Sequence, residues 1–222
     1  PITVPGVVDG WIKMHERFGS MNFEDLFIPT INYARNGFPI TETIAYYLKG
    51  SSERFKSYPN FKDIWMPNNE ILMKGDFFKN PHLANTLEII SKTKRKSFYE
   101  GEIAKVMASF VREEGGFLSA NDLSSFHAEW VEPVSTNYRG FDVWELPPNG
   151  QGIAALQILN LLENYDLKKM GLFSSEYIHY FVEAKKLAFE DRAKYYADPN
   201  FNQINTKYLI SKEYALERMK LI

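Results

Sequence analysis

The 222-residue sequence contains no cysteine. This absence excludes disulfide bonds, thiolate zinc sites and a cysteine nucleophile together. No apolar run reaches the roughly 18 residues of a membrane-spanning helix, and no secretory signal is visible, so a soluble protein is expected. The formal net charge of −2 gives no reason to expect a nucleic-acid partner. Cysteine-free proteins occur inside and outside bacterial cells, so the compartment (cytoplasmic, periplasmic or secreted) stays open.

The sequence also lacks the short motifs that usually mark an active site. Its histidines, His15, His82, His127 and His179, include no pair four residues apart and no His-Glu-x-x-His, so no metal site is expected. No Gly-x-Ser-x-Gly and no Gly-Lys-Ser/Thr sequence occurs. Pro1 cannot be an N-terminal nucleophile, because that role needs Thr, Ser or Cys beside its own α-amine. The residues alone therefore show no complete active site.

Apolar residues make up 45% of the chain and aromatic residues 15%, enough for a sizeable core. Most apolar residues have helical spacing, and polar residues with capping potential precede them. Asn22, Thr41 and Ser211 are predicted N-caps, and Ser119 with Asp122 resembles a capping box that opens a short helix. Besides the short helix that Ser119 opens, the predicted helices cover residues 7–19, 22–37, 41–50 or further, 83–94, 100–114, 153–163, 174–197 and 211 onward.

The second predicted helix is expected to bury four apolar residues, Leu26, Ile28, Ile31 and Ala34. Pro29 is expected to kink this helix or delay its start, because proline lacks an N–H and clashes with the preceding turn.

Three further stretches are interpreted as structural. Residues 59–82 hold several prolines and asparagines and are predicted to be a loop. Arg192 is expected to pair with a carboxylate, and Asp198 to cap the turn at the following proline. A short basic cluster is interpreted as a solvated helix end, and it comprises Lys92, Lys94, Arg95 and Lys96.

Two strand candidates follow each other at residues 134–138 and 141–146. The intervening Arg139-Gly140 favours a tight hairpin. The fold class predicted is therefore α+β, a mostly helical chain with one β-hairpin near residues 132–146.

The stretch after the hairpin, Pro147-Pro148-Asn149-Gly150-Gln151-Gly152, raises the question of a phosphate-binding turn. Gly150-x-Gly152-x-x-Ala155 loosely matches a dinucleotide fingerprint. The two prolines, the antiparallel hairpin and the lack of an acidic residue about 20 positions further on argue against it. We interpret the stretch as a strand-to-helix corner, where both glycines let the helix start close to the sheet. Asn149 and Gln151 are the candidates for side chains that face a substrate cleft.

Several motifs in order resemble the γ-glutamyltranspeptidases and their acylase-like relatives. The matching segments are Val4-Pro5-Gly6-Val7-Val8-Asp9-Gly10-Trp11, His15-Glu16-Arg17-Phe18-Gly19, Ala34-Arg35-Asn36-Gly37-Phe38-Pro39, Phe98-Tyr99-Glu100-Gly101-Glu102-Ile103-Ala104, Gly115-Gly116-Phe117-Leu118-Ser119 with Asn121-Asp122-Leu123, Glu132-Pro133 with Tyr138-Arg139-Gly140, Leu156-Gln157-Ile158-Leu159-Asn160, and Ala188-Phe189-Glu190-Asp191-Arg192 with Asp198-Pro199. Each motif is short, but they occur in the family's order from residue 4 to about residue 199.

The resemblance implies that residues 1–222 are a single partial domain, the large subunit of an Ntn-hydrolase truncated at both ends. Its fold would be the mostly helical portion of an αββα four-layer architecture. The family's precursor cuts itself and exposes a threonine that attacks γ-glutamyl amides such as glutathione. No metal or organic cofactor is implied.

The resemblance places the nucleophile in the small subunit, so no catalytic residue is expected in this chain, which alone would be inactive. The expected partners are that small subunit of the same precursor, or a second copy of the chain, and a small γ-glutamyl substrate. The Asn149-Gly150-Gln151-Gly152 form of the corner is closer to the acylase-like branch, so a cephalosporin or glutaryl acylase stays open. A non-catalytic helical binding module is the remaining alternative.

Overall fold

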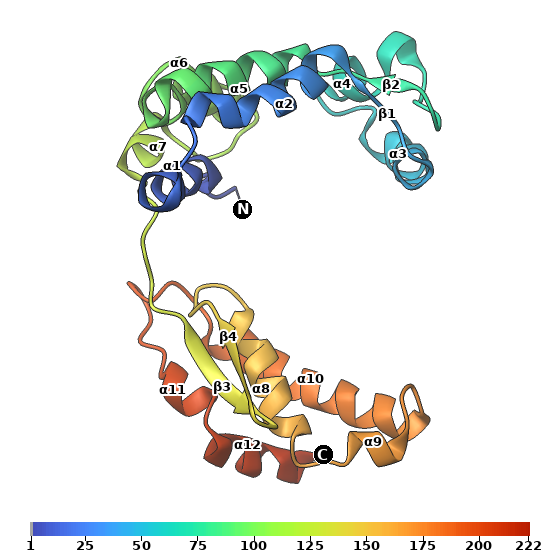
Figure 1. Cartoon of the computed structure of the whole chain (residues 1–222), viewed down its shortest axis with the longest axis vertical. Helices are drawn as coiled ribbons and strands as arrows, with labels where there is room; N and C mark the ends of the chain where they lie inside the picture. Colours follow the sequence, from blue (N-terminus) through green and yellow to red (C-terminus); the bar gives the residue numbers. More distant parts are fainter. Residues whose placement is uncertain (1) are drawn as a thin grey trace. The chain divides into compact units, whose positions relative to one another are not determined.

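The computed structural model describes residues 2–222, which form two compact units (Figure 1). Unit 1 extends to Glu129, and unit 2 comprises Trp130–Ile222. The described residues are mostly helical and contain two small antiparallel sheets of two strands each, which confirms the α+β prediction. Whether residues 1–222 form one partial domain stays a prediction, because two compact units can share one domain. None of the described helices combines the length and the apolar character needed to cross a membrane.

Unit 1 consists of helices and one small two-stranded sheet. Its elements are α1 (Val7–Phe18), α2 (Phe23–Asn36), β1 (Phe38–Pro39), α3 (Glu42–Phe55), α4 (Phe61–Trp65), η1 (Pro67–Asn69), β2 (Phe77–Phe78), α5 (Pro81–Thr93), the π-helical turn η2 (Lys96–Glu100), α6 (Glu102–Glu113) and α7 (Ala120–Ser125). The predicted caps are confirmed: Asn22 and Thr41 accept backbone N–H groups at the starts of α2 and α3, and Ser119 and Asp122 form a capping box.

The core of unit 1 shows which face of α2 points inward, and this corrects the prediction. Helix α2 packs along α5 and buries Phe23, Phe27, Ile31 and Ala34. The expected core residues Leu26 and Ile28 are instead 46% and 52% exposed. The buried residues are spaced i, i+4, i+8, i+11, so they form one stripe along the helix. Packing against α5 decides which stripe is buried, and the local sequence does not reveal that partner.

Two further predictions for unit 1 need correction. Pro29 does not delay α2, which begins at Phe23 and continues through it, and the alternative that Pro29 kinks the helix stays a prediction. The predicted loop at 59–82 contains α4, η1 and β2. Aromatic packing explains this order, because Trp65 stacks on Phe78 with ring centroids 4.8 Å apart, and Phe78 belongs to a small apolar cluster.

Unit 2 comprises one hairpin, the helix α8 that packs on it, and further helices. Its elements are β3 (Val134–Tyr138), β4 (Phe141–Glu145), α8 (Gly152–Leu162), α9 (Leu167–Met170), α10 (Ser175–Tyr195), α11 (Thr206–Leu209), α12 (Lys212–Arg218) and η3 (Met219–Leu221). The predicted hairpin is confirmed, with Tyr138 opposite Phe141 and a two-residue turn between them. Arg139 and Gly140 have φ of 52° and 91°, as the tight turns that match strand twist require.

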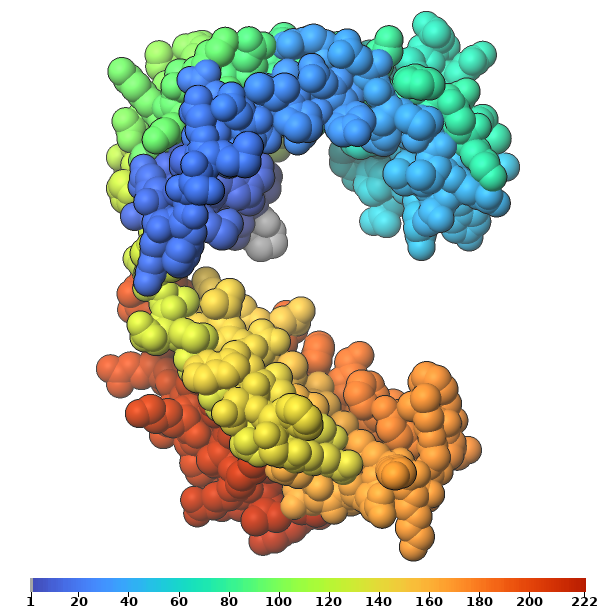
Figure 2. All heavy atoms as spheres, viewed as in Figure 1, coloured from blue at the N-terminus to red at the C-terminus, as the bar shows by residue number. Residues whose placement is uncertain are grey.

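Helix α8 is the centre of unit 2 and packs on both hairpin strands, α10 and α12. Ile153 and Leu156 are buried, and Ile158 and Leu159 are half-buried. Phe141 and Trp144 of the hairpin are exposed. The hairpin (yellow) forms part of the molecular surface in Figure 2. Among the described strands, β3 and β4 pair only with each other, so each has one edge without a partner strand.

Candidate functional site

The corner between β4 and α8 carries the two candidate cleft residues. Pro148 is buried, whereas Asn149 and Gln151 are exposed, and neither side chain hydrogen-bonds to any described residue. Their amides are thus free to meet a ligand. The structure does not test whether they do, and their role stays a proposal.

The two glycines of this corner behave differently. A β-carbon on Gly152 would lie 2.6 Å from Oε2 of Glu145 and 3.1 Å from the Leu146 carbonyl oxygen, so a larger residue would have to displace the Glu145 side chain and would crowd the backbone where α8 begins against β4. A β-carbon on Gly150 would meet no atom within 4 Å. The expectation that both glycines permit the close approach is therefore correct for Gly152 and wrong for Gly150.

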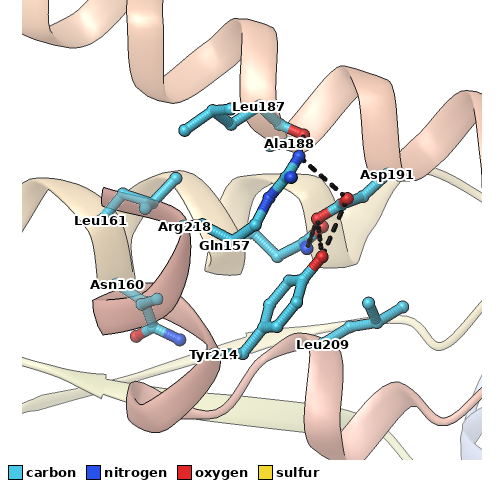
Figure 3. Close-up of a pocket in the computed structure, with 10 residues that line it drawn as sticks. Gln157, Asn160, Leu161, Leu187, Ala188, Asp191, Leu209, Tyr214 and Arg218 are labelled. Carbon is cyan, nitrogen blue, oxygen red and sulfur yellow. Dashed lines mark hydrogen bonds and ion pairs between the residues drawn. The ribbon is translucent and has the colours of Figure 1, made fainter. Parts of the chain in front are cut away.

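Behind the corner, α8 is held by a buried cluster around Asp191 (Figure 3). Nε2 of Gln157 donates to Oδ2 of Asp191 at 2.8 Å, and the hydroxyl of Tyr214 donates to the same carboxylate at 2.9 Å. Arg218 forms an ion pair with Oδ1 of Asp191 at 3.2 Å. Tyr196 donates to Oε1 of Gln157. Helices α8, α10 and α12 thus meet at one carboxylate.

The tyrosines of this cluster are held neutral. Burial is the main cause that raises the pKa of Tyr196 and Tyr214 far above its usual range, and the negative charge of Asp191 raises both further. Tyr214 also donates a hydrogen bond that deprotonation would remove. The cavity beside the cluster measures only about 10 Å³, which is room for at most about one water molecule. The cluster is therefore a structural clamp and not a substrate site.

A second buried contact fixes the other side of α8. The hydroxyl of Thr136 on β3 donates to Oδ1 of Asn160 at 2.7 Å, and Nδ2 of Asn160 donates to the Ile210 carbonyl at 2.7 Å. Lys212 bonds both Asn160 and the carboxylate of Glu163. The Lys212 bond, with the backbone N–H of Arg139, lowers the pKa of Glu163 below its usual value.

Sequence reasoning missed these clamps. Arg192 was the expected ion-pair partner of a carboxylate, but the pair forms at Arg218, and the Arg192 guanidinium lies over the Phe189 ring at 5.5 Å. Gln157 and Asn160 on an otherwise apolar helix were the available signal, because buried amides must find partners. Asp198 does cap its turn, since its Oδ1 accepts the Asn200 N–H at 2.9 Å.

Unit 1 has a comparable clamp at Arg95, which corrects the prediction of a solvated basic end. Arg95 forms an ion pair with buried Asp9 at 3.1 Å and donates to the carbonyls of Ser124 and Phe126. Lys94, with φ of 51°, precedes it at the end of α5, so the chain turns and Arg95 no longer follows the helix into solvent. The remaining lysines of the cluster are exposed.

No group of three or more His, Asp or Glu side chains within residues 2–222 could hold a metal ion. The three polar clusters form their hydrogen bonds and ion pairs mainly between elements of the chain, and none of them pairs a nucleophile with a base. Within residues 2–222, the geometry supports a scaffold for a site rather than a complete site.

Comparison with solved structures shows which class of proteins shares this fold. The fold matches a cephalosporin acylase from Bacillus halodurans with a TM-score of 0.92 and 36% identity, covering 100% of this chain and 42% of that one. It also matches Helicobacter pylori γ-glutamyltranspeptidase with a TM-score of 0.91 and 33% identity, covering 99% of this chain and 63% of that one. Both are Ntn-hydrolases of the expected kind.

The sequence comparisons agree. The γ-glutamyltranspeptidase family model matches residues 1–222, and the chain belongs to this family. It is 36% identical to the glutathione hydrolase-like YwrD proenzyme of Bacillus subtilis over 96% of the chain, and 36% identical to the glutathione hydrolase proenzyme of Escherichia coli over 95%. It is 31% identical to an acylase proenzyme of a Pseudomonas species over 100% of the chain. The chain spans only 37–41% of these relatives' own length.

Proposed function

We propose that this chain forms much of the helical scaffold of an Ntn-hydrolase that transfers or hydrolyses γ-glutamyl amides. The observation that carries the proposal is the family match over residues 1–222, together with relatives named as glutathione hydrolase proenzymes. The catalytic threonine would come from a small subunit of the same precursor, outside residues 1–222. An acyl-enzyme would form on that threonine, and water or an amine would accept the acyl group.

The buried clusters of this chain support that division of labour. Asp191, Arg95 and Glu163 bond to neighbouring helices and strands, so these three charged groups position elements and do not activate a nucleophile. The chain alone is therefore expected to be inactive, and the partner subunit is expected to complete the site.

The test compares the isolated chain with its full-length precursor on a γ-glutamyl anilide. The precursor should release the aniline, and the isolated chain should release none above background. Turnover by the isolated chain would refute the assignment of the nucleophile to another segment.

An acylase that cleaves glutaryl or cephalosporin amides is the second candidate. The Asn149-Gly150-Gln151-Gly152 corner and the likeness to the cephalosporin acylase favour it. A γ-glutamyl group carries an α-ammonium that a glutaryl group lacks, so a site built to bind this charge should reject glutaryl amides strongly. The ratio of kcat/KM for matched γ-glutamyl and glutaryl anilides decides between the two.

Asn149 and Gln151 are the residues of this chain proposed to face the substrate. In the precursor, Asn149→Ala and Gln151→Ala should raise KM for the better substrate several-fold without loss of stability, because both side chains are exposed and make no internal bond. An unchanged KM for both variants would remove the corner from the site.

A further inference from the structure

An apolar groove with a volume of about 520 Å³ lies between α1 and α2 in unit 1. Trp11, Met14 and Phe18 line it from α1, and Leu26 and Phe27 line it from α2. The exposed fractions of Met14, Phe18 and Leu26 are 54%, 67% and 46%. Leaving this much contiguous apolar surface in water is unfavourable, and such a patch marks an interaction site.

The two walls repeat one pattern. Trp11, Met14 and Phe18 are spaced i, i+3, i+7 along α1, and Phe23, Phe27 and Thr30 are spaced i, i+4, i+7 along α2. Each wall is therefore one face of a helix, and the rows of side chains on two such faces form the kind of groove into which a third helix packs.

The polar groups of the groove argue against a small polar ligand. A ring nitrogen of His15 is already engaged with the Met21 carbonyl oxygen at 2.8 Å, which also folds the α1–α2 connection onto α1. The Thr30 hydroxyl and the indole N–H of Trp11 are the other polar side-chain groups of the lining residues. A small polar ligand needs several convergent polar groups, whereas the apolar face of a helix does not.

We propose that the α1–α2 groove is the docking surface for an amphipathic helix of the same precursor that lies outside residues 1–222. The proposal rests on the proposed function, which assigns a second subunit to that precursor. Its main support is length, since the relatives matched over nearly all of this chain are more than twice as long. The occupant presents apolar residues at i, i+3 or i+4, and i+7 to the groove.

The absence of cysteine provides a direct test by thiol labelling. Met14→Cys places a thiol in the groove, and Ile28→Cys places one on α2 but outside the groove lining. The native side chains are 54% and 52% exposed, so the two thiols should react with a maleimide at similar rates in the isolated chain. In the full-length precursor, Cys at position 14 should react slower than Cys at position 28 by about tenfold or more. Mass spectrometry of the labelled peptides assigns each rate to its site.

Equal rates in the precursor would overturn the proposal, whether or not the isolated chain folds. Protection of position 14 that grows with concentration of the isolated chain would show a second copy in the groove and would also overturn it. A photo-crosslinker on the thiol at position 14 should capture a precursor peptide outside residues 1–222, and capture of a peptide within them would contradict the assignment. Labelling does not depend on turnover, so a precursor inactive on γ-glutamyl amides would refute the proposed function alone.

Discussion

Gln157 and Asp191 lie 34 residues apart in the chain, and the side-chain amide of one donates to the carboxylate of the other at 2.8 Å. Both residues are buried, at 3% and 4% exposure. A buried charge is tolerated only where partners replace its hydration. The position of α8, and with it the corner that holds Asn149 and Gln151, therefore depends on a bond to α10.

Removal of the Asp191 carboxylate should destabilise unit 2 strongly. Asp191→Ala leaves the Gln157 amide and the Tyr214 hydroxyl without their acceptor and removes the buried carboxylate that pairs with Arg218, and breaking such a buried pair costs about 3–5 kcal/mol. Urea unfolding followed by circular dichroism measures the loss. Glu190→Gln is the matched control, because Glu190 also bonds Arg218 but its side chain is 69% exposed, so a change of about 0–1 kcal/mol is expected. Similar losses for both variants would contradict the clamp.

Arg95 should not be replaceable by lysine. Its guanidinium reaches Asp9, the Ser124 carbonyl and the Phe126 carbonyl at once, and a lysine ammonium cannot reproduce that planar fork. Arg95→Lys should lower the free energy of unfolding of unit 1 by about 2–4 kcal/mol, since buried Asp9 loses most of its pairing. Lys96→Ala, one residue further along and exposed, should stay within about 0.5 kcal/mol of the parent. Amide exchange at Ala128, whose N–H donates to Asp9, should speed up in Arg95→Lys only.

The corner glycines should respond oppositely to alanine. Gly152→Ala drives a methyl group against the Glu145 side chain and the Leu146 carbonyl, and forced packing of this kind costs about 1–3 kcal/mol. The added methyl group of Gly150→Ala meets open space. This variant should be neutral or more stable by up to about 1 kcal/mol, because alanine lowers the conformational entropy of the unfolded chain. Chemical denaturation of the two variants side by side checks this. A neutral Gly152→Ala would show that α8 does not start tightly against β4.

Glu163 should make unit 2 sensitive to acid. Its hydrogen bond from Lys212, followed by the backbone bond from Arg139, lowers the pKa of this carboxyl below 4.5 in the folded chain. A lowered folded pKa means that the stabilisation is complete above about pH 4.5 and is lost as the pH falls through the folded value. Glu163→Gln should therefore cost about 0–1 kcal/mol at pH 7, with a smaller difference near pH 3. Glu129→Gln, at an exposed carboxyl with no ion pair among the described residues, is the control and should leave the free energy of unfolding at pH 7 within about 0.5 kcal/mol of the parent.

Helix starts and the hairpin could be predicted because their signals are local. The caps at Asn22, Thr41 and Ser119 accept N–H groups only two or three residues away. The Arg139-Gly140 turn likewise depends on its own dihedral preferences.

The direction in which residues face could not be predicted in the same way. Leu26 and Phe27 are adjacent and similarly apolar, and contact with α5 decides that Phe27 is buried. Arg95 in a run of basic residues looks like surface, yet a turn at Lys94 and a carboxylate 86 positions upstream make it internal. Asn149 and Gln151 stay predictions for a related reason, since only a ligand or a further chain could show what they face.

The separate cores of the two units have a calorimetric consequence. Val8, Leu87 and Leu123 belong to an apolar cluster that ends before Glu129, and Leu161, Ala184 and Ala215 belong to one that begins after Trp130. Each cluster can lose its packing while the other keeps its own, so heat should not melt residues 2–222 as one cooperative block. In scanning calorimetry, the van't Hoff enthalpy, which is derived from the steepness of the transition, should be smaller than the calorimetric enthalpy.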